Sequence, residues 1–217
     1  MFRIKTALSA ARWLGIREGS REHREILSAY NGVRPLPRGY AVKDTDPWCA
    51  AFASAAAVMA GAGERYPLEC SCSKIIEKAR SMGIWVERDS HLPRAGDWVL
   101  YNWQAKAAGD DTGAPDHVGV VIGVENGEIL AVEGNYDNAV KLRRFPVDWE
   151  KLRGFVCPGG EEEIMRYHTL EEVPEYARAT IEKLTKDGSL KGVAEDDLGL
   201  SEDLVRTLVI LDRRGRL

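Results

Sequence analysis

Cys49 is the residue whose setting first suggests chemistry. It follows Pro47 and Trp48 and precedes the small, apolar run 50–61, which predicts a helix that starts around Pro47 or Trp48 with Asp46 as its N-cap. At the first turn of a helix, unpaired backbone N–H groups and the helix dipole stabilise a thiolate and can face an oxyanion. Cysteine is also a common buried core residue, so its position alone favours neither interpretation.

The other cysteines, Cys70, Cys72 and Cys157, have no such setting and are interpreted as structural thiols. The Cys-x-Cys spacing at 70 and 72 suits zinc poorly, and no second close pair supplies further ligands. Residues 1–15 lack the apolar block and the cleavage site of a secretory signal. We therefore expect a chain that stays in the cytoplasm until something releases it, with free thiols.

A nucleophilic cysteine needs a general base, and His117 is the best placed of the four histidines. It opens the strongly apolar, β-rich run 117–124, which would hold its ring rigidly near the rim of a sheet. Asn126-Gly127 predicts a hairpin turn. The returning strand would bring Glu133 and Asn135 back near His117, where either side chain could hold the imidazole in one tautomer.

The remaining pattern predicts the elements that must position these side chains. Helical spacing and β-rich runs predict helices over 6–17, 21–30, 47–61 and 73–82 and strands over 98–101, 117–124, 128–135, 140–145 and 154–156. Helices followed by an antiparallel sheet indicate an α+β domain, which we place at 1–158. The Gly- and Glu-rich stretch 159–165 is typical of a linker.

The C-terminal part, residues 166–217, is predicted to be a small helical module that folds separately. A capping box of Thr169 and Glu172 precedes a helix to Lys186, and Ser201 caps a helix over 202–213. The charge also divides there: residues 1–160 carry 21 Lys and Arg against 20 Asp and Glu, whereas residues 161–217 carry 9 against 14. An acidic tail argues against a nucleic-acid partner, and no apolar run is long enough to span a membrane.

Four segments in the same order resemble the CHAP domain, a papain-like class of cysteine amidohydrolases and peptidases, over residues 44–158. They are Trp48–Phe52, Gly96–Tyr101, His117–Val121 and Val132–Asn135. The resemblance implies a papain-like CHAP fold and cleavage of an amide bond in bacterial peptidoglycan. It implies Cys49 as nucleophile, His117 as general base, Glu133 as the group that orients the imidazole, and Asn135 as an assisting residue.

The family contains N-acetylmuramoyl-L-alanine amidases and peptide-crosslink endopeptidases, and the sequence does not separate the two. Candidate substrate contacts are Trp48, Trp103, Asp116 and Tyr136. No cofactor is expected. Asp44 and Asp46 could contribute to a calcium site, although an N-cap role for Asp46 is favoured over metal binding.

The C-terminal module faintly resembles a single surface-layer-homology repeat, which implies binding to a wall polymer. The alternative is a helical dimerisation element, because a helical hairpin of this size has little core of its own. A hydrolase domain, a wall-associated tail and no evident signal peptide together suggest a phage or prophage endolysin that waits in the host cytoplasm.

Two other functions fit parts of the pattern. A cysteine acyltransferase or deamidase acting on glutamine would form the same thioester with the Cys–His pair and differ only in the acceptor of the acyl group. A catalytically silent wall-binding module is the non-enzymatic alternative. The Cys49, His117 and Glu133 set argues against the silent module, because binding alone does not need a thiolate.

Overall fold

The structure is a computed structural model that describes residues 2–87, 91–106, 112–159, 166–194 and 197–217. Its helices are α1 (Phe2–Ala11), α2 (Arg21–Asn31), α3 (Cys49–Met59), α4 (Cys72–Ser81), α5 (Glu175–Lys186) and α6 (Glu202–Arg213), with 3₁₀ turns at Pro37–Gly39 and Gly63–Arg65. Its strands are β1 (Trp85–Val86), β2 (Trp98–Tyr101), β3 (His117–Glu125), β4 (Glu128–Tyr136), β5 (Ala139–Pro146), β6 (Leu152–Val156), β7 (Arg166–Tyr167) and β8 (Leu200–Ser201).

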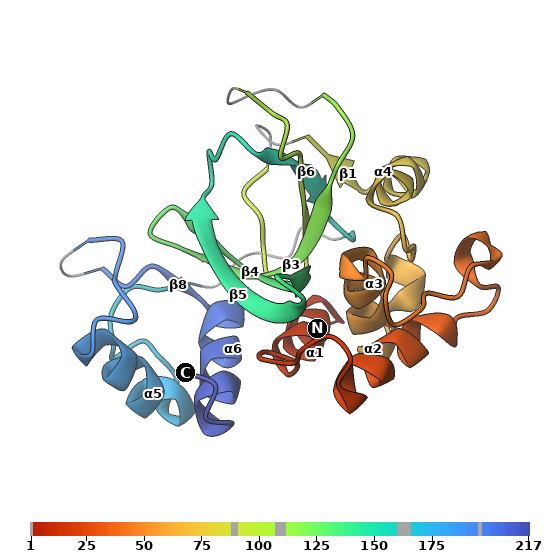
Figure 1. Cartoon of the computed structure of the whole chain (residues 1–217). Coiled ribbons are helices and arrows are strands. Elements are labelled where there is room, and N and C mark those ends of the chain that lie inside the picture. The colour runs from red at the N-terminus through yellow and green to blue at the C-terminus, as the bar shows by residue number, and fades with distance from the viewer. Residues whose placement is uncertain (1, 88–90, 107–111, 160–165, 195–196) are drawn as a thin grey trace.

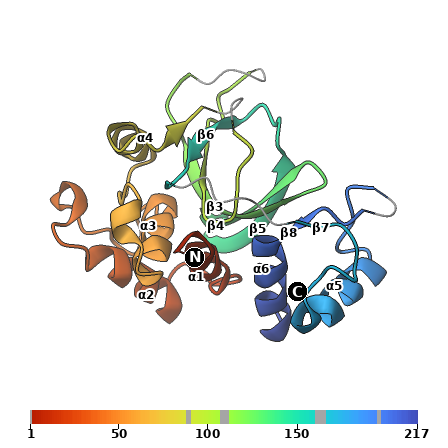
Figure 2. The same ribbon diagram turned by 180° about the vertical axis from the view of Figure 1, so that it is seen from behind.

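The main sheet is antiparallel and has the strand order β1-β6-β2-β3-β4-β5. It curves strongly, with α1, α2 and α3 gathered beside it, as Figures 1 and 2 show from opposite sides. The predicted α+β class and papain-like CHAP architecture are confirmed. Among the described residues, no helix has both the length and the apolar character needed to cross a membrane.

Strand β3 is buried on both faces, which explains why its sequence is apolar without alternation. Val118, Val120 and Ile122 belong to the core shared with the helices. Val121 packs in a second cluster with Tyr101 and other side chains from the sheet. Because neighbouring side chains on a strand point to opposite faces, His117 and Gly119 lie on the same face as Val121.

The first helix lies earlier in the chain than the sequence predicts, over residues 2–11 instead of 6–17. Gly15, with φ of +84°, turns the chain away from the helix, and its N–H donates to the carbonyl of Val140. Ile16 then accepts from the N–H of Val140, and Arg17 bridges Ala139. The chain from Gly15 to Arg17 therefore runs beside β5 instead of extending the helix.

The predicted capping box before α5 is also wrong. The Glu172 carboxylate accepts from the N–H of His168, and α5 begins after Pro174 without a side-chain cap. Ser201 does cap α6, by accepting from the N–H of Leu204.

The C-terminal module packs directly on the rest of the chain. Helix α6 lies against α1 and β3, and Leu204 fills the space over Gly123, where a Cβ atom would lie 2.9 Å from Leu204 Cδ1. The Arg216 guanidinium donates to the carbonyl of Leu14 (2.8 Å). The apolar face of α6 belongs to the same core as the first three helices, so the boundary expected at 159–165 does not separate two cores. Residues 160–165 of the expected linker lie outside the described part of the chain.

Because Leu204 is fully buried at this junction, Leu204→Ala should lower the free energy of unfolding of the whole chain by about 3 kcal/mol. Urea unfolding followed by tryptophan fluorescence and by far-UV circular dichroism measures this loss. Leu217→Ala, at an exposed position, is the control and should change stability little. Two well-separated unfolding transitions would show that the C-terminal module folds independently.

Candidate active site

Cys49 lies in the first turn of α3, as the sequence predicts, although the helix begins at Cys49 itself and not at Pro47 or Trp48, and Asp46 is not its N-cap. Trp48 occupies the N-cap position and makes no capping hydrogen bond with its side chain. The Asp46 carboxylate instead accepts from the Tyr40 hydroxyl and from the N–H of Lys43, both at 2.8 Å. The Asp46 carboxylate therefore does not bind the first N–H groups of α3. Cys49 itself is buried, with 7% of its surface exposed.

Close packing between α3 and β4 places Cys49 against the sheet. A Cβ atom at Gly134 would lie 2.5 Å from Phe52 Cβ and 2.8 Å from the Trp48 ring, so only glycine allows this approach. Trp48 is fully buried, and its indole N–H donates to Glu18 (2.9 Å). The prediction that Trp48 contacts substrate is therefore corrected: its side chain is buried, packs on Phe52 and anchors the start of α3.

A β-bulge puts Glu133 on the same face of the sheet as His117. Near the turn the register pairs Val124 with Ile129, and continuing it would place Glu133 opposite Val120, on the opposite face. The register shifts between Val121 and Gly123, so Val120 pairs with Val132 and Glu133 comes opposite Gly119. The sequence predicts the turn but not this shift.

Gly119 leaves the room that the Glu133 side chain needs to reach the imidazole. A Cβ atom at residue 119 would lie 2.8 Å from Glu133 Cγ and 3.2 Å from the Tyr101 hydroxyl. His117 Nε2 lies 3.0 Å from Glu133 Oε2. Because this contact occupies Nε2, Nδ1 is the ring nitrogen that remains for proton exchange with Cys49.

Glu133 is fully buried and receives hydrogen bonds from three side chains. Besides His117, the Tyr101 hydroxyl donates to Oε1 (2.7 Å), and Arg143 Nη1 lies 3.4 Å from Oε2. Burial raises the pKa of Tyr101 well above its usual value, as does the neighbouring Glu133 charge, so the phenol keeps its proton as a donor. These bonds fix the position of the carboxylate and, through it, the ring plane of His117.

The thiol and the imidazole favour the ion-pair state. Hydrogen bonds from Cys72 and His117, the His117 charge and the N–H of Ala50 lower the pKa of Cys49 well below its usual value, against the opposing effect of burial. Burial lowers the pKa of His117, but hydrogen bonds and charges of Cys49 and Glu133 outweigh it and raise that pKa to about 9. Both pKa shifts favour a thiolate beside an imidazolium over a neutral pair.

Asn135 takes no part in this hydrogen-bond network. It lies where the pairing of β4 with β5 shifts, with φ of +59°, and its side chain makes no hydrogen bond among the described residues. Of the two polar residues that the sequence offered as orienting groups, Glu133 is the one that reaches His117.

Aromatic side chains pack near the His117 ring. Trp103 stacks on Tyr101 with ring centroids 5.1 Å apart and lies 5.9 Å from His117, and Tyr136 lies 6.3 Å from His117. Asp116 is exposed and accepts from the N–H of Trp103 (2.8 Å). Three of the four predicted substrate contacts, Trp103, Asp116 and Tyr136, thus lie next to the thiol–imidazole pair or to one another.

Arg143 and Tyr101 are part of the site, although the sequence pattern does not identify them. The Arg143 guanidinium lies 4.4 Å from the Tyr136 ring centroid and contacts Glu133. Its place in the alternating strand 140–145 was the only available signal, because which face Arg143 occupies depends on the β4–β5 register. Tyr101 was assigned to a strand, but its role depends on pairing with His117, which the sequence does not specify.

The residues considered for calcium have other partners. Asp44 pairs with Arg24 (3.0 Å) and Asp46 accepts the two hydrogen bonds described above, so calcium binding stays a prediction. Within the described part of the chain, His91, Asp97 and Cys157 have ligand atoms within 4.8 Å of one another. The Asp97 carboxylate there already pairs with Arg3 and accepts from His91 and the N–H of Arg94, as a structural carboxylate does.

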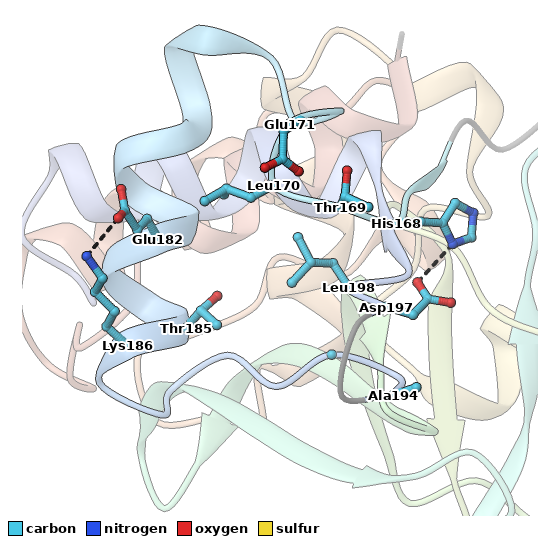
Figure 3. Close-up of a pocket in the computed structure, with 11 residues that line it drawn as sticks. His168, Thr169, Leu170, Glu171, Glu182, Thr185, Lys186, Ala194, Asp197 and Leu198 are labelled. Carbon is cyan, nitrogen blue, oxygen red and sulfur yellow. Dashed lines mark hydrogen bonds and ion pairs between the residues drawn. The ribbon is translucent and has the colours of Figure 1, made fainter.

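A cavity of about 530 Å³ opens in the C-terminal module, away from Cys49. Leu170 and Leu198 contribute apolar surface, and polar side chains also line it, including the His168–Asp197 and Glu182–Lys186 pairs (Figure 3). Its lining comes from the segment before α5, from one face of α5 and from the loop before β8.

Comparison with known proteins gives one match. The family model described as the CHAP domain matches residues 41–135, a segment that contains Cys49, His117, Glu133 and Asn135. No curated protein and no solved structure matches the chain.

Glu133→Gln should lower the pKa of His117 below the value of about 9, because an amide can accept from the ring but does not stabilise its positive charge. A pH titration of the His117 ring signals by NMR measures this pKa without any substrate. Glu128→Gln, in the same strand, is the control and should leave it unchanged. An unaltered titration in Glu133→Gln would remove Glu133 as the group that stabilises the imidazolium.

Proposed function

Because residues 41–135 form a CHAP domain, we propose that this protein hydrolyses amide bonds of bacterial peptidoglycan through a thioester on Cys49. The domain supports a peptidoglycan amidase or endopeptidase in general. The observation that carries the proposal is the buried chain of contacts from Cys49 through His117 to Glu133, which favours a thiolate beside an imidazolium.

The first half of the reaction forms the thioester. The Cys49 thiolate attacks the amide carbonyl carbon, and the electron pair of the C=O bond moves to oxygen. In this proposal, N–H groups at the first turn of α3, including that of Cys49, would donate to this oxyanion. When the oxyanion collapses, the C–N bond breaks and His117 Nδ1 gives its proton to the leaving nitrogen.

The second half restores the enzyme. Neutral His117 takes a proton from water, and the resulting hydroxide attacks the thioester carbonyl. The C–S bond breaks, which releases a carboxylic acid and returns Cys49 to the thiolate and His117 to the imidazolium. Glu133 keeps Nδ1 pointed at the reacting atoms throughout and stabilises the ring whenever it is charged.

The alternatives differ from the proposed hydrolase in the acceptor of the acyl group, in the substrate, or in having no reaction at all. An acyltransferase would pass the acyl group to an amine or alcohol, whereas a glutamine deamidase would use water on a protein or peptide. A silent wall-binding module would have no use for the depressed thiol pKa of Cys49. The CHAP match favours peptidoglycan as the substrate over these alternatives.

Cys49→Ala should reduce the clearing of a peptidoglycan suspension to less than about a tenth of the parent's rate, with an unchanged far-UV spectrum. His117→Ala should be equally severe, because the two groups act as a unit. Cys70→Ser is the matched control and should stay active. Mass spectrometry of the released fragments then identifies the bond cut, and an active Cys49→Ala chain would exclude this nucleophile.

For the C-terminal module we infer binding to a wall polymer in preference to dimerisation. The apolar side chains of α6 that a dimer would use, such as Leu204, Leu208 and Leu211, are buried within the chain. The 530 Å³ cavity, by contrast, remains open and combines apolar with hydrogen-bonding side chains. With this tail, the hydrolase suits host lysis by a phage or prophage endolysin that acts once it is released from the cytoplasm.

Thr185→Trp should obstruct this cavity and weaken binding to purified cell walls several-fold. The pull-down uses chains that also carry Cys49→Ala, so that the walls are not degraded, and Thr185→Ala serves as a control that keeps the cavity open. Sedimentation of the same chains reports the oligomeric state. Unchanged wall binding in Thr185→Trp would exclude this cavity as the wall site, and a stable dimer would favour the dimerisation alternative.

A further inference from the structure

Cys72 lies against the nucleophile, although its sequence position marked it as a structural thiol. It is the first residue of α4, just as Cys49 is the first residue of α3, so two helix N-termini meet at this point. The two sulfur atoms are 3.9 Å apart, and Cys72 is only 8% exposed. Neither cysteine forms a disulfide, so the contact is a hydrogen bond from one sulfur to the other.

Charge determines which of the two sulfurs donates. The Cys49 sulfur faces the imidazolium of His117, which stabilises a thiolate there. The Cys72 sulfur faces the Cys49 sulfur, and the Asp116 carboxylate also acts on it; both negative groups and burial raise the pKa of Cys72. Cys72 therefore keeps its proton, and its S–H points toward the Cys49 sulfur.

We propose that Cys72 is a positioning residue for the reaction of Cys49: its S–H donates a hydrogen bond to the Cys49 thiolate and holds that sulfur beside His117. The inference rests on the proposed function, in which Cys49 is the nucleophile. The Cys49 sulfur then has two partners: the positive charge of His117 and the neutral S–H donor of Cys72. Because both sulfur atoms belong to buried side chains, a neutral donor is effective there.

The pH dependence of Cys49 alkylation tests this directly. Iodoacetamide reacts with the thiolate, so its rate of reaction with Cys49, followed by mass spectrometry of the Cys49 peptide, reports the pKa of that thiol. In Cys72→Ala the midpoint should move up by about one pH unit, the effect of one weak charge-assisted hydrogen bond. Cys72→Ser keeps a donor and should restore most of the shift.

Activity measurements on the same variants provide the second readout. The acidic limb of the pH–rate profile for peptidoglycan cleavage should move up with the alkylation midpoint in Cys72→Ala, while the rate well above both midpoints changes less. Cys70→Ala is the matched control, since it removes a partly buried thiol two residues away that has no contact with Cys49 among the described residues. It should shift neither measurement.

The outcomes are separable. A Cys72→Ala chain with the parent's alkylation midpoint, or an equal shift in Cys70→Ala, would overturn the role of Cys72. If Cys72→Ala does not fold, Cys72→Val fills the site without a donor and must give the same upward shift. A shifted midpoint in a protein that fails to cleave peptidoglycan would support the contact and overturn the proposed function, because alkylation needs no wall substrate.

Discussion

The buried carboxylate of Glu133 is the group on which the rest of the site depends. Removing a carboxylate from water costs several kcal/mol, which is recovered only if the charge is paired and hydrogen bonded. His117, Tyr101 and Arg143 supply those partners from three different strands. The charge in turn keeps the imidazole protonated, and the imidazolium stabilises the Cys49 thiolate. The Glu133 carboxylate thus favours the thiolate form of Cys49 through His117, without contacting the sulfur.

Steric room, more than chemical type, decides which polar residue reaches the imidazole. The sequence pattern identified the turn at Asn126-Gly127 and the general return of Glu133 and Asn135 toward His117. It could not choose between them, because a one-residue shift of register turns every side chain to the opposite face. The bulge after Val121 and the space over Gly119 settle the choice, and both depend on the packing of neighbouring strands.

The sequence predicted well what depends on local chemistry and less well what depends on contacts between distant segments. The helix at Cys49, the hairpin turn and the cap at Ser201 follow from nearby residues and are present. The end of α1 was misplaced because the segment after Ala11 bonds to β5, far away in the chain. Arg143 and Cys72 were missed for the same reason: each acquires its role from a partner on another element.

Contacts between distant segments also explain why Cys49, of the four cysteines, is the one suited to nucleophilic attack. Burial alone makes a cysteine less reactive, and it raises the pKa of Cys70 and of Cys157. Cys72 lies at a helix N-terminus as Cys49 does, yet its pKa is raised because a thiolate, not a cation, is its neighbour. At this buried position a helix N-terminus alone therefore does not lower the pKa of a thiol. Cys49 is the thiol best suited to nucleophilic attack, because the His117–Glu133 pair places a positive charge beside it. The pKa of the neighbouring Cys72 is raised instead, so Cys72 keeps its proton.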